Sequence, residues 1–411
     1  MSEAGAAFGA MRLPRSVLFG RGQRRALGSV ASKHGQRALL CTDPRQGAQP
    51  EFLAMVEDLQ AHGVRTHVFD QTIPDLPIAS IQACVEEVRD FGADMVIGVG
   101  GGSSMDMAKV VAVMLTHGGD VRSYYGEFAV PGPVLPLIAL PTTAGTGSEV
   151  TPVAVISDDE RGAKVGIASP HLIPLVAICD PELTVTCPPA LTACSGADAL
   201  THAVEAYTTL ARPVDPMLTE EHVFVGKNLL SDHFARLAVA NIFRFLERGY
   251  RDGADIAARE GLMLASLAAG CAFGTAGTAA AHALQYPVGN LTHTAHGDGV
   301  ATLLPYVMQF NQPYCVDAFA ELARTIGLPE GPAGEMSQAF IDAVADLLAK
   351  VRIPRTLAEL GVKADQQTFI ADNAMNSARL VKNNPRPLDV AAMRNITRAA
   401  FAGDRAALRS I

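Results

Sequence analysis

The sequence lacks several patterns that mark common classes of protein. No run of basic residues is interleaved with aromatic ones, and 42 acidic against 33 basic residues give a formal net charge of -9. Nucleic acid is therefore not an expected partner. The seven cysteines form no CxxC pair, and their odd number argues against a disulfide framework. We expect reduced, mostly buried thiols, as in a cytoplasmic protein.

Two further absences concern export and membranes. The N-terminal residues lack the basic-then-apolar order of a secretion signal. No segment reaches the roughly eighteen continuous apolar residues that a membrane helix needs. We therefore expect a soluble, cytoplasmic protein with no membrane partner.

The sequence is rich in apolar residues and in glycine. Its 411 residues suggest two or three domains, and 49% hydrophobic with 18% charged residues exclude a disordered chain. Glycine occurs 37 times. An α/β fold uses glycine at strand-to-helix turns and wherever the backbone approaches a ligand, so this surplus favours nucleotide binding.

The first part of the chain alternates between strand-like and helix-like patterns. Short apolar runs cover residues 37–43, 65–70, 94–100, 134–141, 152–157 and 175–180, and amphipathic stretches cover 50–63, 78–92 and 104–115. Connections of this length between strands are crossovers. The pattern therefore predicts a parallel sheet within an α/β layer structure.

The pattern changes after Pro188 and Pro189. Long Ala- and Leu-rich helical patterns cover 191–210, 234–250, 254–273 and 337–353. The later part of the chain is therefore predicted to be all-α. Because proline ends regular structure and the composition shifts here, we place a domain boundary at this point, with domains over 1–188 and 189–411.

A cluster of glycines lies where the strand predicted over 94–100 meets the next helix. Its members are Gly98, Gly100, Gly101 and Gly102. Ser103 or Ser104 could cap this helix, whose free N–H groups and positive dipole end suit a pyrophosphate. The spacing does not give GxGxxG, because Ser103 stands three residues after Gly100, and GxxxxGK[ST] is absent. A tight turn without a ligand would show the same pattern.

A second polar loop covers residues 141–149. Its hydroxyl-bearing residues are Thr142, Thr143, Thr146 and Ser148. They suit phosphate and ribose oxygens, although a polar surface loop would look much the same. Two such loops after two parallel strands are more informative, since ligands of open α/β sheets lie outside the carboxyl ends of the strands.

Asp43 ends the strand-like run 37–43. A carboxylate there could bind both hydroxyls of an adenosine ribose and repel a 2′-phosphate. This predicts NAD rather than NADP as the cofactor. An ordinary Asp-Pro turn is the alternative interpretation.

The helical part contains a candidate metal site. Asp198 and His202 are four residues apart, so they lie on one face of a helix. His282 and His296, with His293 nearby, add imidazoles. One carboxylate with three imidazoles suits a divalent first-row metal, Fe2+ as well as Zn2+. Each histidine alone could equally be a hydrogen-bonded core or surface residue, and the spacing leaves both interpretations open.

Five motifs together resemble a known family. In chain order they are GGGSSMD, PTTAGTGSE, GADALTHAVEAY, HALQYPVG and AHGDGVATLLPYVMQFN. They are similar to those of the iron-containing (group III) alcohol dehydrogenases, over nearly the whole chain. The resemblance implies a dehydroquinate synthase-like fold, with an NAD-binding α/β domain built on a parallel sheet and an all-α C-terminal domain that carries the catalytic metal. It also implies a homodimer or higher homo-oligomer.

The resemblance also implies a set of site residues. The metal ligands, which act in catalysis, fall on Asp198, His202, His282 and His296. The cofactor residues fall on Asp43, Gly100, Gly101, Gly102, Ser103, Asp106, Thr142, Thr143, Thr146, Ser148 and Lys164. Lys164 could hold a ribose hydroxyl or be solvated surface, and Asp106 would complement the dipole of its helix with or without a ligand.

Two positions depart from the family pattern. Most of the family has a histidine four residues after the third ligand, where it helps to relay a proton, and here that residue is Tyr286. A tyrosine hydroxyl, with an ordinary pKa of about 10, passes a proton less readily at neutral pH. We count Tyr286 among the catalytic residues. The second departure is Asp75, where the family usually has asparagine.

The stretch over 212–239, between the second and third ligands, is longer than in the common bacterial alcohol dehydrogenases. Together with Tyr286 it resembles the hydroxyacid-oxoacid transhydrogenase branch, whose substrates carry a carboxylate. Arg212, His222 or Lys227 could then supply a positive charge. A surface excursion without substrate contact is the alternative.

These features predict an Fe2+-dependent, NAD-dependent dehydrogenase or aldehyde reductase (EC 1.1.1.-). Its substrate would be a small primary alcohol or hydroxyacid, or the corresponding aldehyde or ketone. The first alternative is a transhydrogenase in which tightly held NAD shuttles hydride between a hydroxyacid and an oxoacid. The second is a non-catalytic nucleotide-binding regulator, against which the set of four ligands argues.

Overall fold

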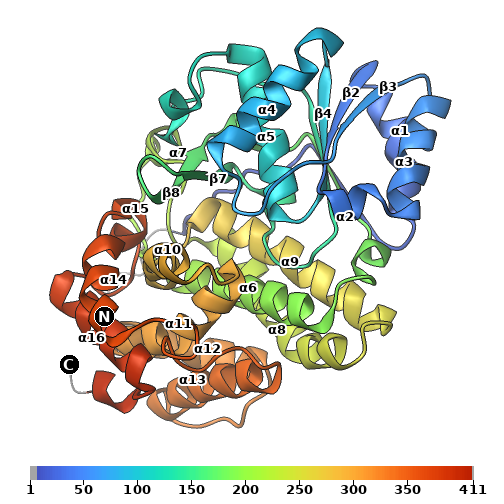
Figure 1. The fold of residues 1–411 in the computed structure, drawn as a ribbon. Coiled ribbons are helices and arrows are strands. Elements are labelled where there is room, and N and C mark those ends of the chain that lie inside the picture. The colour runs from blue at the N-terminus through green and yellow to red at the C-terminus, as the bar shows by residue number, and fades with distance from the viewer. Residues whose placement is uncertain (1–6, 410–411) are drawn as a thin grey trace. The chain divides into compact units, whose positions relative to one another are not determined.

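The computed structural model describes residues 7–409, which form two compact units (Figure 1). The α/β unit is Arg12–Cys187, and the helical unit combines residues 7–11 with 188–409. Hydrogen bonds explain why the first described residues belong with the later part of the chain. Leu229 N donates to Phe8 O (3.0 Å), and Ala10 N donates to the side-chain oxygen of Asn228 (3.3 Å).

A six-stranded parallel sheet forms the centre of the α/β unit, in the order β1-β9-β6-β4-β2-β3. Its strands are β1 (Ser16–Phe19), β2 (Arg37–Cys41), β3 (Arg65–Phe69), β4 (Met95–Gly100), β6 (Leu137–Pro141) and β9 (Val176–Cys179). All but β1 coincide with runs that the sequence predicts as strands. The prediction of a parallel α/β structure is therefore confirmed.

Helices cover both faces of this sheet (Figure 1). They are α1 (Leu27–Ala31), α2 (Pro44–Gly47), α3 (Pro50–Ala61), α4 (Ile78–Val88) and α5 (Gly102–His117). Alternate residues of a strand point to opposite faces. In β2, Leu39 packs with α4 and α5 in one core cluster, whereas Leu40 packs with α1 and α3 in another. Because both faces are buried, the strands are nearly continuous apolar runs, which makes them recognisable in the sequence.

Three further strands form a separate small sheet in the order β5-β8-β7. They are β5 (Gly126–Glu127), β7 (Val153–Asp158) and β8 (Ala163–Ala168). Strands β7 and β8 pair antiparallel. The run 152–157 is therefore a strand, as predicted, but it lies outside the parallel sheet. Strand β8 escapes prediction because its sequence, AKVGIA, is short and interrupted by lysine and glycine.

In the helical unit, one isolated β-bridge, between Ala211 and Gly226, is the extent of β structure among the described residues. The helices are α6 (Pro189–Thr208), α7 (Leu218–Glu221), α8 (Leu229–Arg251), α9 (Ile256–Ala276), α10 (Ala280–Thr292), α11 (His296–Asn311), α12 (Val316–Thr325), α13 (Ala333–Lys350), α14 (Gln367–Ala374), α15 (Ala378–Lys382) and α16 (Val390–Ala402). The four helical patterns of the sequence correspond to α6, α8, α9 and α13. The prediction of an all-α part is therefore confirmed.

Helix α9 is long and apolar enough to cross a membrane by length and composition, although its sequence has no run of about eighteen continuous apolar residues. However, 72% of its apolar window is buried inside the protein, where it packs on α6 and α8. A helix that is apolar on all sides and packed in this way belongs to a protein core. Here it supports α6, whose buried face carries ionisable side chains.

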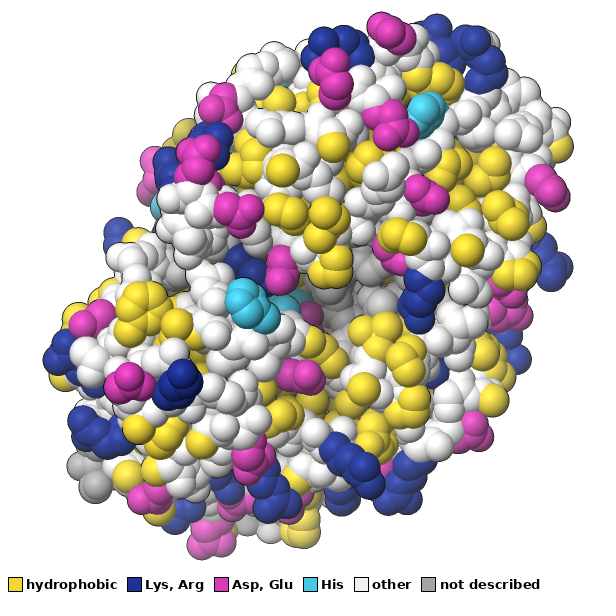
Figure 2. Space-filling view, in the orientation of Figure 1, with side chains coloured by type: hydrophobic (Ala, Val, Ile, Leu, Met, Phe, Trp, Pro, Cys, Tyr) yellow, Lys and Arg dark blue, Asp and Glu magenta, His cyan; other side chains and the backbone are white. Residues whose placement is uncertain are grey.

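Two expectations from the composition can be compared with the structure. Six of the seven cysteines are buried and Cys194 is partly buried, all as free thiols, as expected. On the face of the molecule drawn in Figure 2, acidic and basic side chains are interspersed. That face therefore offers no extended basic area of the kind that nucleic acid requires.

The segment between α6 and α8 is held against the helical unit. Val225 N donates to Thr275 O (2.8 Å), and Leu210 N donates to Asn383 O (3.0 Å). Gly226 has φ +81°, and a Cβ there would collide with the carbonyl oxygen of Leu210. Glycine is therefore required at this point, where the two ends of the segment meet.

We predict that Gly226→Ala strongly destabilises the protein, whereas Gly361→Ala is a matched control. Gly361 also has a positive φ, +92°, but nothing lies within 4 Å of its missing Cβ. The control should lose about 1 kcal/mol from backbone strain alone, and Gly226→Ala about 1–3 kcal/mol more from the collision. Urea unfolding of both variants measures the difference. Equal losses would contradict the close approach of Leu210 and Gly226.

Candidate metal centre and cofactor loops

One face of α6 carries three ionisable side chains at helical spacing. Asp198, His202 and Glu205 are all buried, with exposed fractions of 4%, 5% and 2%. Buried ionisable groups require partners. The partners of these three come from α9, α10 and the start of α11.

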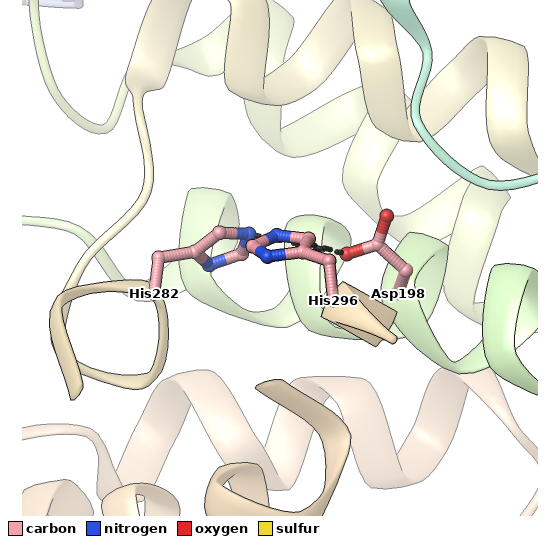
Figure 3. Close-up of side chains that lie close together, drawn as sticks. All are labelled: Asp198, His282 and His296. Atoms are coloured by element: carbon pink, nitrogen blue, oxygen red, sulfur yellow. Dashed lines mark ion pairs between the residues drawn. The ribbon is translucent and has the colours of Figure 1, made fainter. Parts of the chain in front are cut away.

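His282 of α10 and His296, the first residue of α11, point toward Asp198 (Figure 3). The Nε2 atoms of His282 and His296 lie 4.0 and 3.9 Å from Oδ1 of Asp198. The ligand atoms of all three residues lie within 4.8 Å of one another. Ligands bound to one central ion at about 2 Å fall within this separation. Residues from three helices thus form a possible metal centre.

His202 lies beside this group without completing it. Its Nε2 is 3.7 Å from the same oxygen of Asp198, but His202 is not among the three residues whose ligand atoms are all mutually close. The ring of His202 stacks on Phe273 of α9, with centroids 4.1 Å apart and planes at 17°, and its centroid is 4.8 Å from that of His282. Three of the four predicted ligands therefore converge, and the fourth is adjacent.

The donor atoms of the group fit a divalent cation. Oδ1 of Asp198 and Nε2 of His282 are buried and have no hydrogen-bond partner within residues 7–409. Such orphaned atoms are costly unless something binds them. Burial, with the nearby His202, lowers the pKa of His282 to about 3, so its imidazole is neutral, as a metal ligand must be.

Glu205 organises this centre, although the sequence analysis did not single it out. Its carboxylate accepts hydrogen bonds from Nδ1 of His282 (2.6 Å) and from the backbone N–H groups of Ala279 (2.8 Å) and Ala281 (2.7 Å). The bond to Nδ1 directs Nε2 of His282 toward Asp198. Burial raises the pKa of Glu205 to about 7. The signal in the sequence is its position seven residues after Asp198, on the same helical face.

The start of α11 lies directly against α6. A Cβ on Gly297 would collide with the backbone oxygen of Cys194, so only glycine allows the two helices to approach this closely. His296 is thereby held at the first residue of α11. The ring of Tyr286, one turn after His282, is 6.4 Å from that of His296, with planes at 30°. Tyr286 is thus placed beside the ligand group, and its role in catalysis stays a prediction.

The glycine-rich turn follows β4 and begins α5. Gly100 has φ +154°, and a Cβ there would lie only 2.5 Å from Oγ of Ser104. The N-cap of α5 is Gly101, and no side chain caps the helix. The prediction that Ser103 or Ser104 is the cap is therefore wrong, because the helix begins earlier and both serines lie inside its first turn. The backbone N–H groups at this end thus keep no side-chain cap.

The second loop lies next to this turn. Strands β4 and β6 are neighbours, and Thr142 N donates to Gly100 O (2.9 Å). A Cβ on Gly102 would be 2.8 Å from a methyl carbon of Thr146, and one on Gly101 would be 3.6 Å from Thr143. The two loops that the sequence assigns to one ligand are therefore in contact.

Asp43 reaches the same edge of the sheet. Its Oδ1 accepts hydrogen bonds from Arg45 N and Gln46 N, both at 3.0 Å, and so caps α2. Its Oδ2 lies 3.9 Å from the position of a Cβ on Gly100. Asp43 thus caps a turn of the chain and also lies next to the glycine-rich turn. Its binding of a ribose stays a prediction.

Three residues that the resemblance assigns to the cofactor make contacts within the protein. Asp106 accepts from Oγ of Ser148 (2.6 Å) and from Val155 N (2.9 Å), so both of its oxygens are engaged. Lys164 of β8 forms an ion pair with Asp75, whose φ of 63° is left-handed. Lys164, which the resemblance assigns to the cofactor, is therefore paired with a carboxylate of the protein itself. Cofactor contacts of Ser103, Asp106, Ser148 and Lys164 stay predictions.

The chain matches the models of one protein family over most of its length. The model of the iron-containing alcohol dehydrogenase matches residues 14–181, and that of the C-terminal part of the Fe-containing alcohol dehydrogenase family matches 192–401. The long-chain-alcohol dehydrogenase 1 of Geobacillus thermodenitrificans is 36% identical over 379 residues, 91% of each chain. The protein therefore belongs to the iron-containing alcohol dehydrogenase family and is an oxidoreductase (EC 1.1.1.-).

Solved structures of related proteins share the fold. A 1,3-propanediol oxidoreductase has a TM-score of 0.89 at 31% identity, covering 96% of this chain and 100% of the other. The sulfoacetaldehyde reductase of Bifidobacterium kashiwanohense, solved in complex with NAD+, has a TM-score of 0.82 at 26% identity, covering 96% and 98%. The predicted fold class and family are confirmed.

We predict that Glu205→Gln weakens metal binding about ten- to a hundredfold. The amide keeps one acceptor oxygen and places an NH2 group against donors, so it cannot satisfy Nδ1 of His282 and both backbone N–H groups as the carboxylate does. Titration of the metal-free protein with Co2+, followed by its visible spectrum, measures the affinity. Thr397→Val is a matched control, since it removes a buried hydroxyl of α16 that donates to Met393 O, away from the ligands and from Glu205. Unchanged affinity in the Glu205 variant would contradict its orienting role.

Proposed function

We propose that this protein is a dehydrogenase that interconverts a small primary alcohol or hydroxyacid and its aldehyde or ketone. Its cofactors would be Fe2+, or alternatively Zn2+, and NAD. The observation that supports the proposal most strongly is the convergence of Asp198, His282 and His296, two of which carry buried atoms without a hydrogen-bond partner in the described chain. Family membership gives the class of reaction, while the substrate and the residue roles are our proposal.

In this proposal Asp198, His202, His282 and His296 hold the metal. When bound, the metal acts as a Lewis acid on the alcohol or carbonyl oxygen of the substrate. The protein's own contribution is to present the ligands in a fixed orientation. Glu205 holds His282 through its Nδ1, and Phe273 fixes the plane of the His202 ring.

The cofactor would bind at the carboxyl edge of the parallel sheet. The uncapped N-terminus of α5 at Gly100–Gly102 suits a pyrophosphate, because its N–H groups and dipole favour an anion. Asp43 and the hydroxyls of the loop Thr142–Ser148 suit ribose and phosphate oxygens, and the charge of Asp43 favours NAD over NADP. When bound, the nicotinamide exchanges hydride with the carbon of the substrate. The NAD+ named in the structure of the sulfoacetaldehyde reductase supports this choice.

Tyr286 would move a proton between the site and solvent. Its ring stands beside His296, and a phenolic hydroxyl can both donate and accept a proton. The proposal therefore keeps Tyr286 as a catalytic residue in the place of the histidine of the family.

Transhydrogenation between a hydroxyacid and an oxoacid is the alternative. It draws on the long stretch between the second and third ligands, where Arg212, His222 or Lys227 could bind a carboxylate. The contacts of Lys227 weigh against that residue. Its Nζ donates to Tyr207 O (2.6 Å) and pairs with Asp232 (2.7 Å), so its charge is already balanced inside the helical unit. NAD that stays bound through purification, with turnover of two substrates and no added cofactor, would favour the alternative.

Location and assembly complete the proposal. We expect a cytoplasmic protein that forms a homodimer or higher homo-oligomer, with no nucleic acid or membrane partner. The intact set of four ligand residues disfavours a non-catalytic regulator.

We predict that His282→Ala abolishes metal binding and lowers turnover by at least about a thousandfold, because the variant loses a metal ligand and its hydrogen bond to Glu205. The protein is loaded anaerobically with Fe2+ and screened with NAD and a panel of short alcohols, hydroxyacids and aldehydes. NADH binding should persist, since the cofactor loops lie in the α/β unit. The control is His293→Asn, because His293 is exposed with a left-handed φ that asparagine tolerates. Full activity of His282→Ala would overturn the assignment.

We predict that Tyr286→Phe lowers kcat at neutral pH about ten- to a hundredfold while leaving the metal content unchanged, because only the proton-passing hydroxyl is lost. Tyr286→His should restore the rate at neutral pH. The pH profile of kcat for the three proteins tests this. A phenylalanine variant with the kcat of the wild type at every pH would exclude a relay through Tyr286.

A further inference from the structure

Lys109 is a buried cation that the proposed chemistry leaves without a role. It lies two turns into α5, after the glycine-rich turn, and only 1% of its surface is exposed. Burying an ammonium group is costly unless all its protons are bonded. The contacts of its side chain therefore indicate what the burial achieves.

All three protons of Lys109 can be used within one short segment. Its Nζ donates to Thr151 O (2.9 Å), to Oγ1 of Thr151 (3.2 Å) and to Val153 O (2.8 Å). These acceptors lie just after the second loop, at Thr151 and at the first residue of β7, Val153. The ammonium thus binds the point at which the chain leaves the loop.

Asp106 acts on the same segment from one turn earlier on α5. Its two oxygens accept from Oγ of Ser148 and from Val155 N. Residues three apart share a helical face. Asp106 and Lys109 therefore bind the chain over 148–155 at five points.

The beginning of the loop also rests on α5. Gly102 makes room for Thr146, and Gly101 lies beneath Thr143. The loop Thr142–Ser148 is thus held at both ends by the helix whose N-terminus would receive the pyrophosphate. The hydrogen bonds to Lys109 and Asp106 therefore restrict movement of the loop backbone relative to that N-terminus.

We propose that Lys109, together with Asp106, is a positioning residue for the dinucleotide. It acts through the loop Thr142–Ser148 and does not touch the cofactor. This rests on the proposed function, because it takes NAD as the ligand of the two loops. It also gives Asp106 a role different from the direct cofactor contact that the family resemblance implies.

The charges around Lys109 make its hold on the chain over 148–155 sensitive to pH. The groups that face it are Asp106 on its own helix and Glu149 in the turn Ser148–Val150. Glu149 is fully buried, and its oxygens have no hydrogen-bond partner in another described residue. Burial lowers the pKa of Lys109 to about 8 and raises that of Glu149 to about 7. Above about pH 8 a neutral amine has two protons for three acceptors, so the hold on the loop weakens.

The test is NADH affinity of the full-length protein, measured by fluorescence at several pH values. Lys109→Met should bind NADH at least tenfold more weakly at pH 7 and bind the same amount of metal as the wild type. The affinity of the wild type should fall as the pH rises through 8, and that of the variant should not. Glu149→Gln should keep the fall but move it to lower pH, because the carboxylate of Glu149 raises the pKa of Lys109. A fall that persists without Glu149 separates Lys109 from the titration of Glu149. The matched control Lys33→Met changes an exposed lysine and should behave as the wild type.

Thr151→Val provides a second variant in case Lys109→Met does not fold. It removes the Oγ1 acceptor but keeps both carbonyl oxygens, so a smaller loss of affinity, about two- to fivefold, is expected. Wild-type affinity at every pH in either variant overturns the proposal for Lys109. Failure of the wild type itself to bind NADH would instead overturn the proposed function.

Discussion

The buried carboxylate of Glu205 joins α6 and α10, two of the three helices that carry the candidate metal ligands. Two backbone N–H groups at the start of α10 would otherwise be unsatisfied, and Glu205 accepts both together with Nδ1 of His282. One side chain of α6 therefore fixes the position of α10 and the direction of its ligand. The candidate ligand Asp198 lies two turns earlier on the same face of α6. One helix therefore positions both Asp198 and the carboxylate that orients His282.

The helices and strands that the sequence predicts well are those with a clear pattern of apolar residues. Strands such as β2 and β4 are continuous apolar runs because the sheet is buried on both faces, and α6, α8 and α9 repeat apolar residues at helical spacing. Local spacing also places Asp198 and His202 on one face. The convergence of Asp198 with His282 and His296 cannot be derived from spacing, which left the metal site and ordinary buried or surface histidines both open. The motif order of the family favoured the metal site.

The sequence does not predict which distant residues form hydrogen bonds with its polar side chains. Glu205 and Ala279 are 74 positions apart, and Asp106 and Val155 are 49 apart. A motif shows which residue types recur but not which atoms they contact. The resemblance therefore linked Asp106 with the cofactor, whereas its oxygens accept hydrogen bonds from Ser148 and Val155. The prediction of a serine cap for α5 was wrong because the helix already begins at Gly102. Its N-cap is Gly101, which has no side chain to accept a hydrogen bond. Strand β8, with its weak pattern, takes its conformation from pairing with β7.

If Asp43 binds the adenosine ribose as proposed, this residue ties cofactor preference to folding. One oxygen caps α2 while the other is directed to the glycine edge. A substitution such as Asp43→Ala, made to admit a phosphorylated ribose, would also remove the cap of α2. Loss of the cap would lower the stability of the protein by about 1 kcal/mol. Asparagine keeps a capping oxygen and discards only the charge. Asp43→Asn is therefore the most conservative substitution for changing the cofactor, because it retains the cap of α2, a helix of four residues.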